Sequence, residues 1–129
     1  MQKIMIVDDD KEHSKVIKEL LETCQKPYDV ICVENGLECL QLLDKISIDK
    51  EMLPDLILLD IKMPEMDGWE TFHHLRNNMS LKNIPVIFFS AQKDYFSKTY
   101  GELFGTDFIE KPYDLDVLFE KIKKILKTD

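Results

Sequence analysis

The sequence contains no apolar run close to the roughly 18 residues that a bilayer-spanning helix requires, and Met1-Gln2-Lys3 leads into a short apolar run without a signal-peptide pattern. Basic residues are scarce, because 17 lysines and arginines stand against 25 aspartates and glutamates and leave a net charge of −8. Such a surface repels phosphate backbones and anionic lipid, which disfavours direct binding to nucleic acid or membranes. We expect a cytoplasmic protein whose residues 1–129 form one domain.

Cysteine is also scarce, and its pattern excludes several kinds of site. Cys24, Cys32 and Cys39 are an odd number, and their spacing matches no CxxC-type metal or redox motif. We expect all three to be small buried apolar side chains in a reducing compartment. Repeats, linkers and low-complexity stretches are absent, and the apolar fraction of 44% is that of a globular chain.

Short β-branched apolar runs alternate along the chain with segments of helical period. The runs suit strands that are covered on both faces of a sheet, and they comprise residues 3–7, 29–33, 56–59, 85–89 and 108–109. Three segments carry clear apolar stripes: Val16, Ile17, Leu20, Leu21 and Cys24; Leu37, Leu40 and Leu43; and Leu115, Leu118, Phe119, Ile122, Ile125 and Leu126.

The remaining segments complete five strand–helix units. Residues 69–76 and 95–104 fit two further helices, the last helix starts at Asp114, and residues 46–53 form a surface loop. This order predicts an α/β fold with a doubly wound, five-stranded parallel sheet and five helices.

Polar residues follow four of the predicted strands. Asp8-Asp9-Asp10 comes after the first, Asp60 after the third, Ser90 after the fourth and Lys111 just beyond the fifth. Any one of them has a plain structural explanation, since an aspartate or serine caps helices and Lys-Pro is an ordinary turn. Together they lie at the carboxyl edge of a parallel sheet, where ligand sites form.

These residue types suit phosphoryl transfer. Clustered carboxylates cannot all remain ionised without a compensating cation, and hard oxygen ligands favour Mg²⁺. A hydroxyl and an ammonium group beside such a site are suited to holding phosphoryl oxygens. An aspartate carboxylate can then act as the nucleophile.

The motifs occur in the order seen in a known family. They are residues 3–10 (KIMIVDDD), residues 56–64 (LILLDIKMP), Met66-Asp67-Gly68, Ser90-Ala91 and Lys111-Pro112. Over nearly its whole length, the chain resembles the receiver domain of two-component response regulators. The spacings of 51, 30 and 21 residues between Asp9, Asp60, Ser90 and Lys111 also suit that family.

The resemblance implies a role for each residue that matches a motif. Asp60 would accept a phosphoryl group from a sensor histidine kinase or a histidine phosphotransfer protein. Asp8, Asp9 and Asp60 would hold Mg²⁺. Of Asp8 and Asp9, we expect Asp9 to be the direct ligand, and the Lys62 backbone carbonyl would complete the protein ligands.

Around the phosphoryl group, Ser90 would donate a hydrogen bond to one oxygen and Lys111 would form an ion pair. The bond between Lys111 and Pro112 is typically cis in this family. In the resulting switch, Ser90 moves toward the phosphate and an aromatic residue, here Phe108, turns inward. Phe108 lacks the phenol hydroxyl that is often found at this position. Our hypothesis is that the balance between the inward and outward states of the ring therefore differs from that of a tyrosine.

The resemblance also implies an output surface, the face made by the fourth helix, fifth strand and fifth helix, which binds a downstream protein target or forms a dimer. The aromatic segment 95–104 fits part core and part partner surface. Lys62 departs from the usual polar or acidic residue, and two readings stay open: contact with the metal or phosphoryl group, or a solvent-pointing lysine. We assign no role to His13, and we expect His73 and His74 on the surface.

Three rival classes share parts of the pattern. A phosphatase of the haloacid dehalogenase type would use Asp8 as nucleophile and Asp10 as acid–base group, but it needs Thr or Val where this chain has Glu12. A degenerate receiver would lack part of the phosphorylation set, which is complete here. An FMN carrier of the flavodoxin type would place a Ser/Thr-rich phosphate cradle where Asp8-Asp9-Asp10 repels phosphate. We expect a phosphorylation-dependent signalling domain and not an enzyme acting on an external metabolite.

Overall fold

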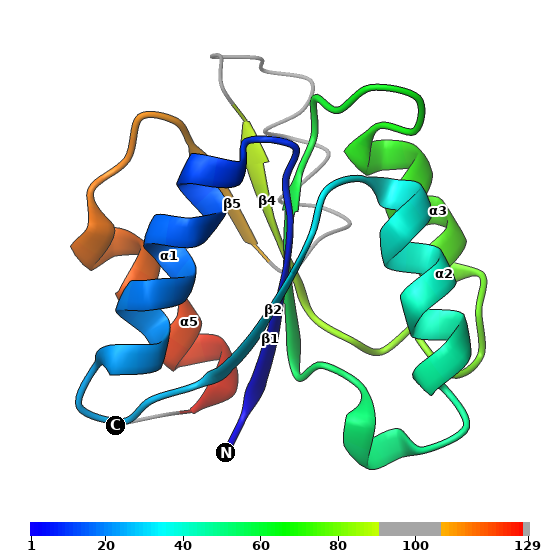
Figure 1. Ribbon diagram of the computed structural model, residues 1–129, viewed down its shortest axis with the longest axis horizontal. Helices are drawn as coiled ribbons and strands as arrows, with labels where there is room; N and C mark the ends of the chain where they lie inside the picture. Colours follow the sequence, from blue (N-terminus) through cyan, green and yellow to red (C-terminus); the bar gives the residue numbers. More distant parts are fainter. Residues whose placement is uncertain (91–106, 128–129) are drawn as a thin grey trace.

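In this computed structural model of the protein, residues 1–90 and 107–127 are described. A central sheet separates two pairs of helices (Figure 1). Helices α1 (Lys11–Thr23) and α5 (Leu115–Leu126) cover one face, and α2 (Gly36–Ile46) and α3 (Gly68–Arg76) cover the other. None of the helices in the described ranges is long and apolar enough to cross a membrane.

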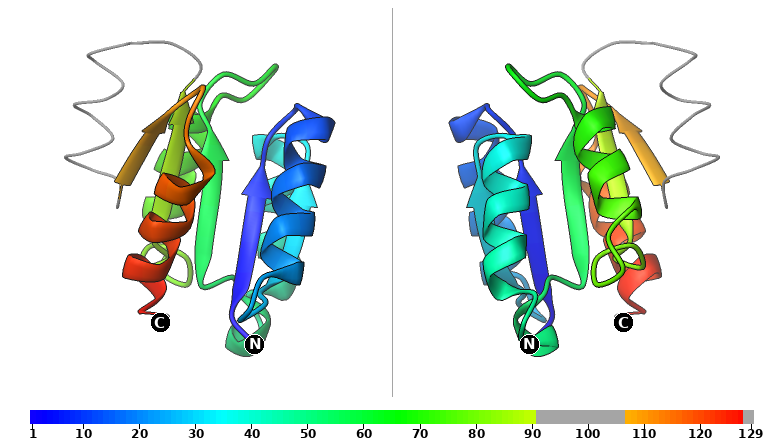
Figure 2. Two further views of the ribbon diagram at one scale, coloured as in Figure 1. Left: turned by 90° about the vertical axis from the view of Figure 1, so that its left-hand side faces the viewer. Right: turned by 90° about the vertical axis from the view of Figure 1, so that its right-hand side faces the viewer.

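The sheet has five parallel strands, which confirms the predicted fold class. The strands are β1 (Lys3–Val7), β2 (Asp29–Val33), β3 (Leu56–Asp60), β4 (Val86–Ser90) and β5 (Asp107–Glu110). Their order is β2-β1-β3-β4-β5, so β1 and β3 lie next to each other at the centre. Because the strands run in the same direction, their carboxyl ends meet at one edge (Figure 2).

Each described helix begins at a side chain that accepts a hydrogen bond from its first turn. Asp10, Asn35, Asp67 and Asp114 cap α1, α2, α3 and α5, and Asp114 is where the sequence placed the start of the last helix. The described ranges hold four α-helices; the predicted helix at residues 95–104 lies outside the described residues. Within the predicted loop 46–53, residues Lys50–Met52 form one 3₁₀ turn.

Two hydrophobic layers explain why the strands are almost continuously apolar. Successive side chains of a strand point to opposite faces, so Met5 and Val7 contribute to the layer under α2 and α3, whereas Ile4 and Ile6 contribute to the layer under α1 and α5. Every side chain of β3 is buried. The polar residues at the carboxyl edge therefore follow directly on strands that are packed on both faces.

The apolar stripes of the helices are only partly buried. Val16, Leu37 and Leu115 belong to the predicted apolar stripes but are 51%, 45% and 38% exposed. In α2 the buried side is centred on Cys39 and Leu43, because the helix docks with that side on the sheet. The prediction for the cysteines holds for Cys39 alone, since Cys24 is half-buried and Cys32, on the edge strand β2, is exposed.

Candidate functional site

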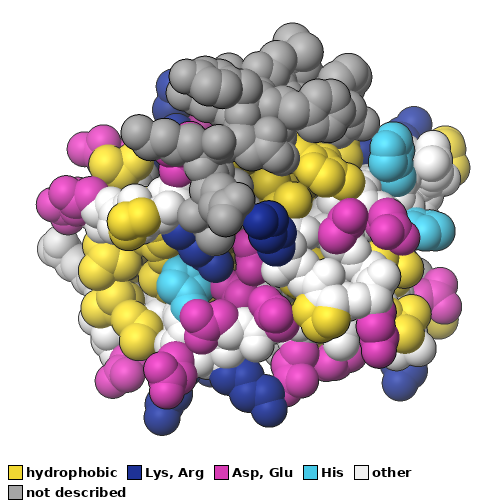
Figure 3. Space-filling view, turned by 90° about the horizontal axis from the view of Figure 1, so that it is seen from above, with side chains coloured by type: hydrophobic (Ala, Val, Ile, Leu, Met, Phe, Trp, Pro, Cys, Tyr) yellow, Lys and Arg dark blue, Asp and Glu magenta, His cyan; other side chains and the backbone are white. Residues whose placement is uncertain are grey.

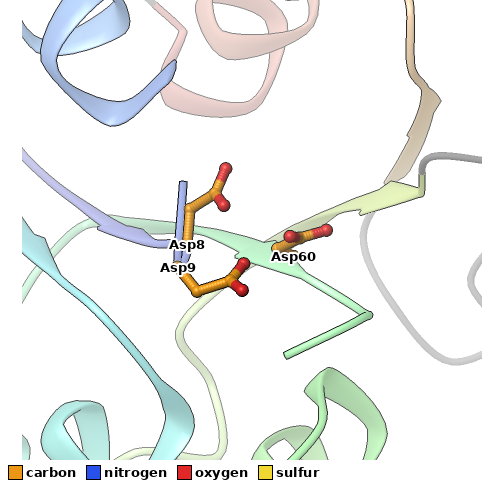
Figure 4. A group of neighbouring side chains, drawn as sticks. All are labelled: Asp8, Asp9 and Asp60. Carbon is orange, nitrogen blue, oxygen red and sulfur yellow. The ribbon is translucent and has the colours of Figure 1, made fainter. Parts of the chain in front are cut away.

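Three carboxylates meet at the carboxyl edge of the two central strands (Figure 4). Asp60 is the last residue of β3, and Asp8 and Asp9 follow β1, whose Val7 pairs with Leu59. One carboxylate oxygen from each aspartate lies within 4.8 Å of the others. Asp8 and Asp60 are 2% and 6% exposed, whereas Asp9 is open to solvent. The cluster predicted from the strand ends is therefore formed.

Lys111 reaches the same cluster from the end of the edge strand β5. Its Nζ atom lies 3.2 Å from Oδ2 of Asp8 and 3.7 Å from Oδ2 of Asp60. Lys111 follows β5, which is separated from β3 by β4. The Lys111-Pro112 peptide bond is cis, as expected. Figure 3 shows acidic side chains gathered beside basic and histidine side chains on this face.

Asp8 is held ionised by its hydrogen bonds. Burial by itself raises the pKa of this carboxyl group, but the His13 ring, the Asp10 backbone N–H and Lys111 outweigh burial and lower the pKa to about 2. The Nδ1 atom of His13 lies 2.7 Å from Oδ2, and the Asp10 nitrogen lies 2.9 Å from Oδ1. Asp8 is therefore ionised at neutral pH, next to Asp60.

Asp60 is in the opposite situation. Burial raises its pKa to about 7; Lys111 opposes this shift, and the neighbouring carboxylates of Asp8 and Asp9 add to it. The three carboxylates thus carry more negative charge than Lys111 balances. A small divalent cation with a preference for hard oxygen ligands fits this donor set. Such an ion would favour the ionised form of Asp60.

The segment after Asp60 is anchored by a glycine. The Gly68 N–H donates to the Ile61 carbonyl at 2.8 Å, and a Cβ atom at Gly68 would lie 2.4 Å from the Asp60 carbonyl oxygen. Only glycine permits this close approach of α3 to the end of β3. The exposed Lys62 and the half-buried Trp69 line an open cleft of about 540 Å³ beside Asp9.

The predicted switch residues are described to different extents. Phe108 is 7% exposed and packs in the hydrophobic layer under α2 and α3, opposite Phe88 on β4. Its ring therefore points inward. Ser90 is the last residue of β4, and its backbone pairs with Glu110. The role predicted for the Ser90 side chain lies outside what the structure describes.

Two residues of the site were missed by the sequence reasoning. His13 lies in the first turn of α1 and contacts Asp8, and Tyr113, two residues after Lys111, contacts His13 through its hydroxyl group. The usable signal was the position of His13 five residues after Asp8, just inside the capped start of a helix. His73 and His74 are exposed on α3, as expected.

Comparison with known proteins identifies the family. The family model of the response regulator receiver domain matches residues 4–123. The chain belongs to the receiver domains of response regulators. Receiver domains are the phosphoacceptor modules of two-component signalling.

Individual relatives agree with this assignment. The chain is 35% identical to the transcriptional regulatory protein CrdR of Helicobacter pylori, with 99% of the chain and 56% of CrdR covered. It is 35% identical to protein PilG of Pseudomonas aeruginosa, covering 94% of the chain and 84% of PilG. The Mn²⁺-bound form of the response regulator Rcp1 superposes with a TM-score of 0.78 at 27% identity, covering 99% of this chain and 94% of Rcp1. This receiver domain thus spans just over half the length of CrdR.

Proposed function

We propose that residues 1–129 form one receiver domain in which Asp60 accepts a phosphoryl group from a sensor histidine kinase or a histidine phosphotransfer protein. The observation that carries the proposal is the convergence on Asp60 of one lysine, from the end of β5, and two further carboxylates, from the end of β1. Asp60 is the one of the three aspartates that ends a strand, at the centre of the sheet.

The proposed transfer moves a phosphoryl group between two side chains. An oxygen of the ionised Asp60 carboxylate attacks phosphorus while the phosphorus–nitrogen bond of the donor phosphohistidine breaks. The electron pair of that bond leaves with the histidine nitrogen, which regains its lone pair. Lys111 stabilises negative charge on the phosphoryl oxygens, and the Ser90 hydroxyl donates a hydrogen bond to one of them.

Mg²⁺ is the cofactor that we propose for this site. The carboxylates of Asp8, Asp9 and Asp60 and the backbone carbonyl of Lys62 would hold it. The ion would neutralise negative charge on the phosphoryl oxygens during transfer. The negative charge that Lys111 leaves unbalanced supports this proposal, and so does the Mn²⁺-bound form of the relative Rcp1.

The output of the domain is proposed to be a change in protein contacts. Phosphorylation draws the Ser90 side chain toward Asp60, and Phe108 stabilises the state in which its ring fills the inward position. The face that we expect from the predicted helix at residues 95–104 together with β5 and α5 then binds a downstream protein or a second copy. The proposal includes a cytoplasmic location, no direct contact with nucleic acid or membranes, and no turnover of an external metabolite.

Intact-mass spectrometry tests the phosphoacceptor directly. The wild type and Asp60→Ala are incubated with acetyl phosphate, with and without Mg²⁺. We expect a mass gain of one phosphoryl group in the wild type only, and only with Mg²⁺. An adduct that survives in Asp60→Ala would refute the proposal and indicate Asp8 as the nucleophile, as in the haloacid dehalogenase type of phosphatase. If acetyl phosphate leaves the wild type unmodified, the same comparison is made with phosphoramidate.

A further inference from the structure

A chain of three polar side chains links the acidic cluster to the loop that carries Lys111. The His13 ring lies between Asp8, whose Oδ2 is 2.7 Å from Nδ1, and Tyr113, whose hydroxyl contacts Nε2. Phe89 packs edge-on against the same ring, with the ring centroids 5.5 Å apart. Helix α1, strand β4 and the segment after β5 thus enclose the imidazole on three sides.

The direction of the two hydrogen bonds follows from the groups involved. An ionised carboxylate only accepts hydrogen bonds. Nδ1 of His13 therefore carries a proton and donates a hydrogen bond to Asp8. Burial, with a contribution from the charge of Asp8, raises the pKa of the Tyr113 hydroxyl to about 12, so this hydroxyl stays protonated. In the neutral ring, Nε2 accepts from Tyr113. The phenol thereby fixes the orientation in which Nδ1 faces Asp8.

His13 and Lys111 share the same oxygen atom. Oδ2 of Asp8 lies 2.7 Å from His13 and 3.2 Å from Lys111, whereas Lys111 is 3.7 Å from Asp60 and makes no hydrogen bond to it at that distance. In the proposed transfer Lys111 pairs with the phosphoryl group on Asp60, which draws its ammonium group away from Asp8. That movement removes one of the two side-chain hydrogen bonds to Oδ2 of the buried Asp8, which is costly unless another donor remains on that oxygen.

We propose that His13 is a positioning residue for phosphoryl transfer: its Nδ1–H remains on Asp8 and so releases Lys111 toward Asp60, while Tyr113 holds the ring in place. This inference rests on the proposed function, because it assigns His13 a role in the same reaction. Once Lys111 has moved, Asp8 keeps the Asp10 N–H on Oδ1 and the His13 N–H on Oδ2. Without His13, Oδ2 would hold Lys111 back.

Two substitutions of His13 separate the two bonds of the imidazole. The amide nitrogen of asparagine occupies the place of Nδ1, so His13→Asn keeps a donor for Asp8 and loses the contact to Tyr113. The amide of glutamine reaches the place of Nε2, so His13→Gln keeps the contact to Tyr113 and loses the donor. The two variants differ by one methylene group, which makes each the control for the other. Tyr113→Phe removes a single hydroxyl group and leaves His13 intact.

The rate of phosphorylation by acetyl phosphate, at saturating Mg²⁺ and donor, is the first measurement. We expect about a tenfold slower rate in His13→Gln, because a hydrogen bond to a charged group is lost. His13→Asn and Tyr113→Phe each lose the contact between positions 13 and 113 but keep a donor for Asp8, so both rates should fall only about threefold. A wild-type rate in His13→Gln, or equal losses in Gln and Asn, would overturn the inference.

Nitrogen NMR of the imidazole gives a readout that a role in packing alone would not predict. With uniformly ¹⁵N-labelled protein, the His13 signals are assigned by their loss in His13→Asn. We expect Nδ1 to carry a proton in the metal-free wild type; an unprotonated Nδ1 would refute the inference. The proposed function fails separately, if the wild type itself takes no phosphoryl group on Asp60.

Discussion

Replacing Asp60 by asparagine should stabilise the metal-free protein. Burial raises the pKa of Asp60 from 3.8 to about 7, and the neighbouring Asp8 and Asp9 carboxylates add to the rise, so at pH 8 the folded chain holds a charge that the unfolded chain accommodates more easily. Asparagine has nearly the same shape and no charge. Asp60→Asn therefore removes the electrostatic cost while leaving the packing of β3 intact.

The size and sign of the effect follow from linkage. One pKa unit corresponds to about 1.36 kcal/mol, so a rise from 3.8 to about 7 sets a ceiling of about 4 kcal/mol. That pKa already includes the opposing attraction of Lys111, but the buried amide of asparagine has a desolvation cost of its own, which leaves a net gain of about 1–2 kcal/mol. For a domain of this size, that gain raises Tm by about 3–10 °C.

The pH dependence is the sharper part of the prediction. Between pH 4 and pH 7 the unfolded state ionises Asp60 before the folded state does, so the contribution of this residue to stability falls as pH rises. Asparagine does not ionise, so Asp60→Asn does not lose stability in this way as pH rises. The gap in Tm between the two proteins should be small at pH 4.5 and full at pH 8.

Thermal unfolding followed by circular dichroism measures the gap. Both proteins are unfolded in EDTA across this pH range and again in excess Mg²⁺, which should narrow the gap by stabilising the wild type more strongly. A variant that unfolds at or below the wild-type temperature at pH 8 would refute the reasoning. So would a gap that does not change with pH.

Three further substitutions test other parts of the site. Gly68→Ala should cost about 1–3 kcal/mol in urea unfolding, because its Cβ would lie 2.4 Å from the Asp60 carbonyl oxygen; an unchanged midpoint would contradict the close approach. Lys62→Asn should change the dephosphorylation rate, because a lysine at this position contacts the metal or phosphoryl group in our hypothesis, and equal rates would refute that role. Phe108→Tyr should shift the active population, seen in the amide NMR shifts of β5 with beryllofluoride; unchanged shifts would refute a role for the missing hydroxyl.

Much of the fold follows from local patterns along the chain. A strand buried on both faces needs apolar residues at successive positions, and β1 and β3 have them. Asp114 precedes the last helix and caps it, because its short side chain accepts a hydrogen bond from a backbone N–H of the first turn. The meeting of Asp8, Asp9 and Asp60 follows as well, since parallel strands bring their carboxyl ends to one edge.

Other properties depend on how the elements dock. Helical period shows that α1 and α2 are amphipathic, but only the contact with the sheet decided that Val16 and Leu37 face outward. The contact between His13 and Tyr113 joins residues that are 100 positions apart, so no local spacing predicts it. The raised pKa of Asp60 likewise needs burial by the surrounding chain.

The sequence by itself therefore determined the strands, the helix starts and the residues that gather at the carboxyl edge, because each depends on neighbours a few positions away or on the common direction of the strands. Only the tertiary structure decided which partners the polar atoms of that edge have. Hydrogen-bond geometry and the cost of burying charge depend on distances of a few ångströms between segments far apart in the chain.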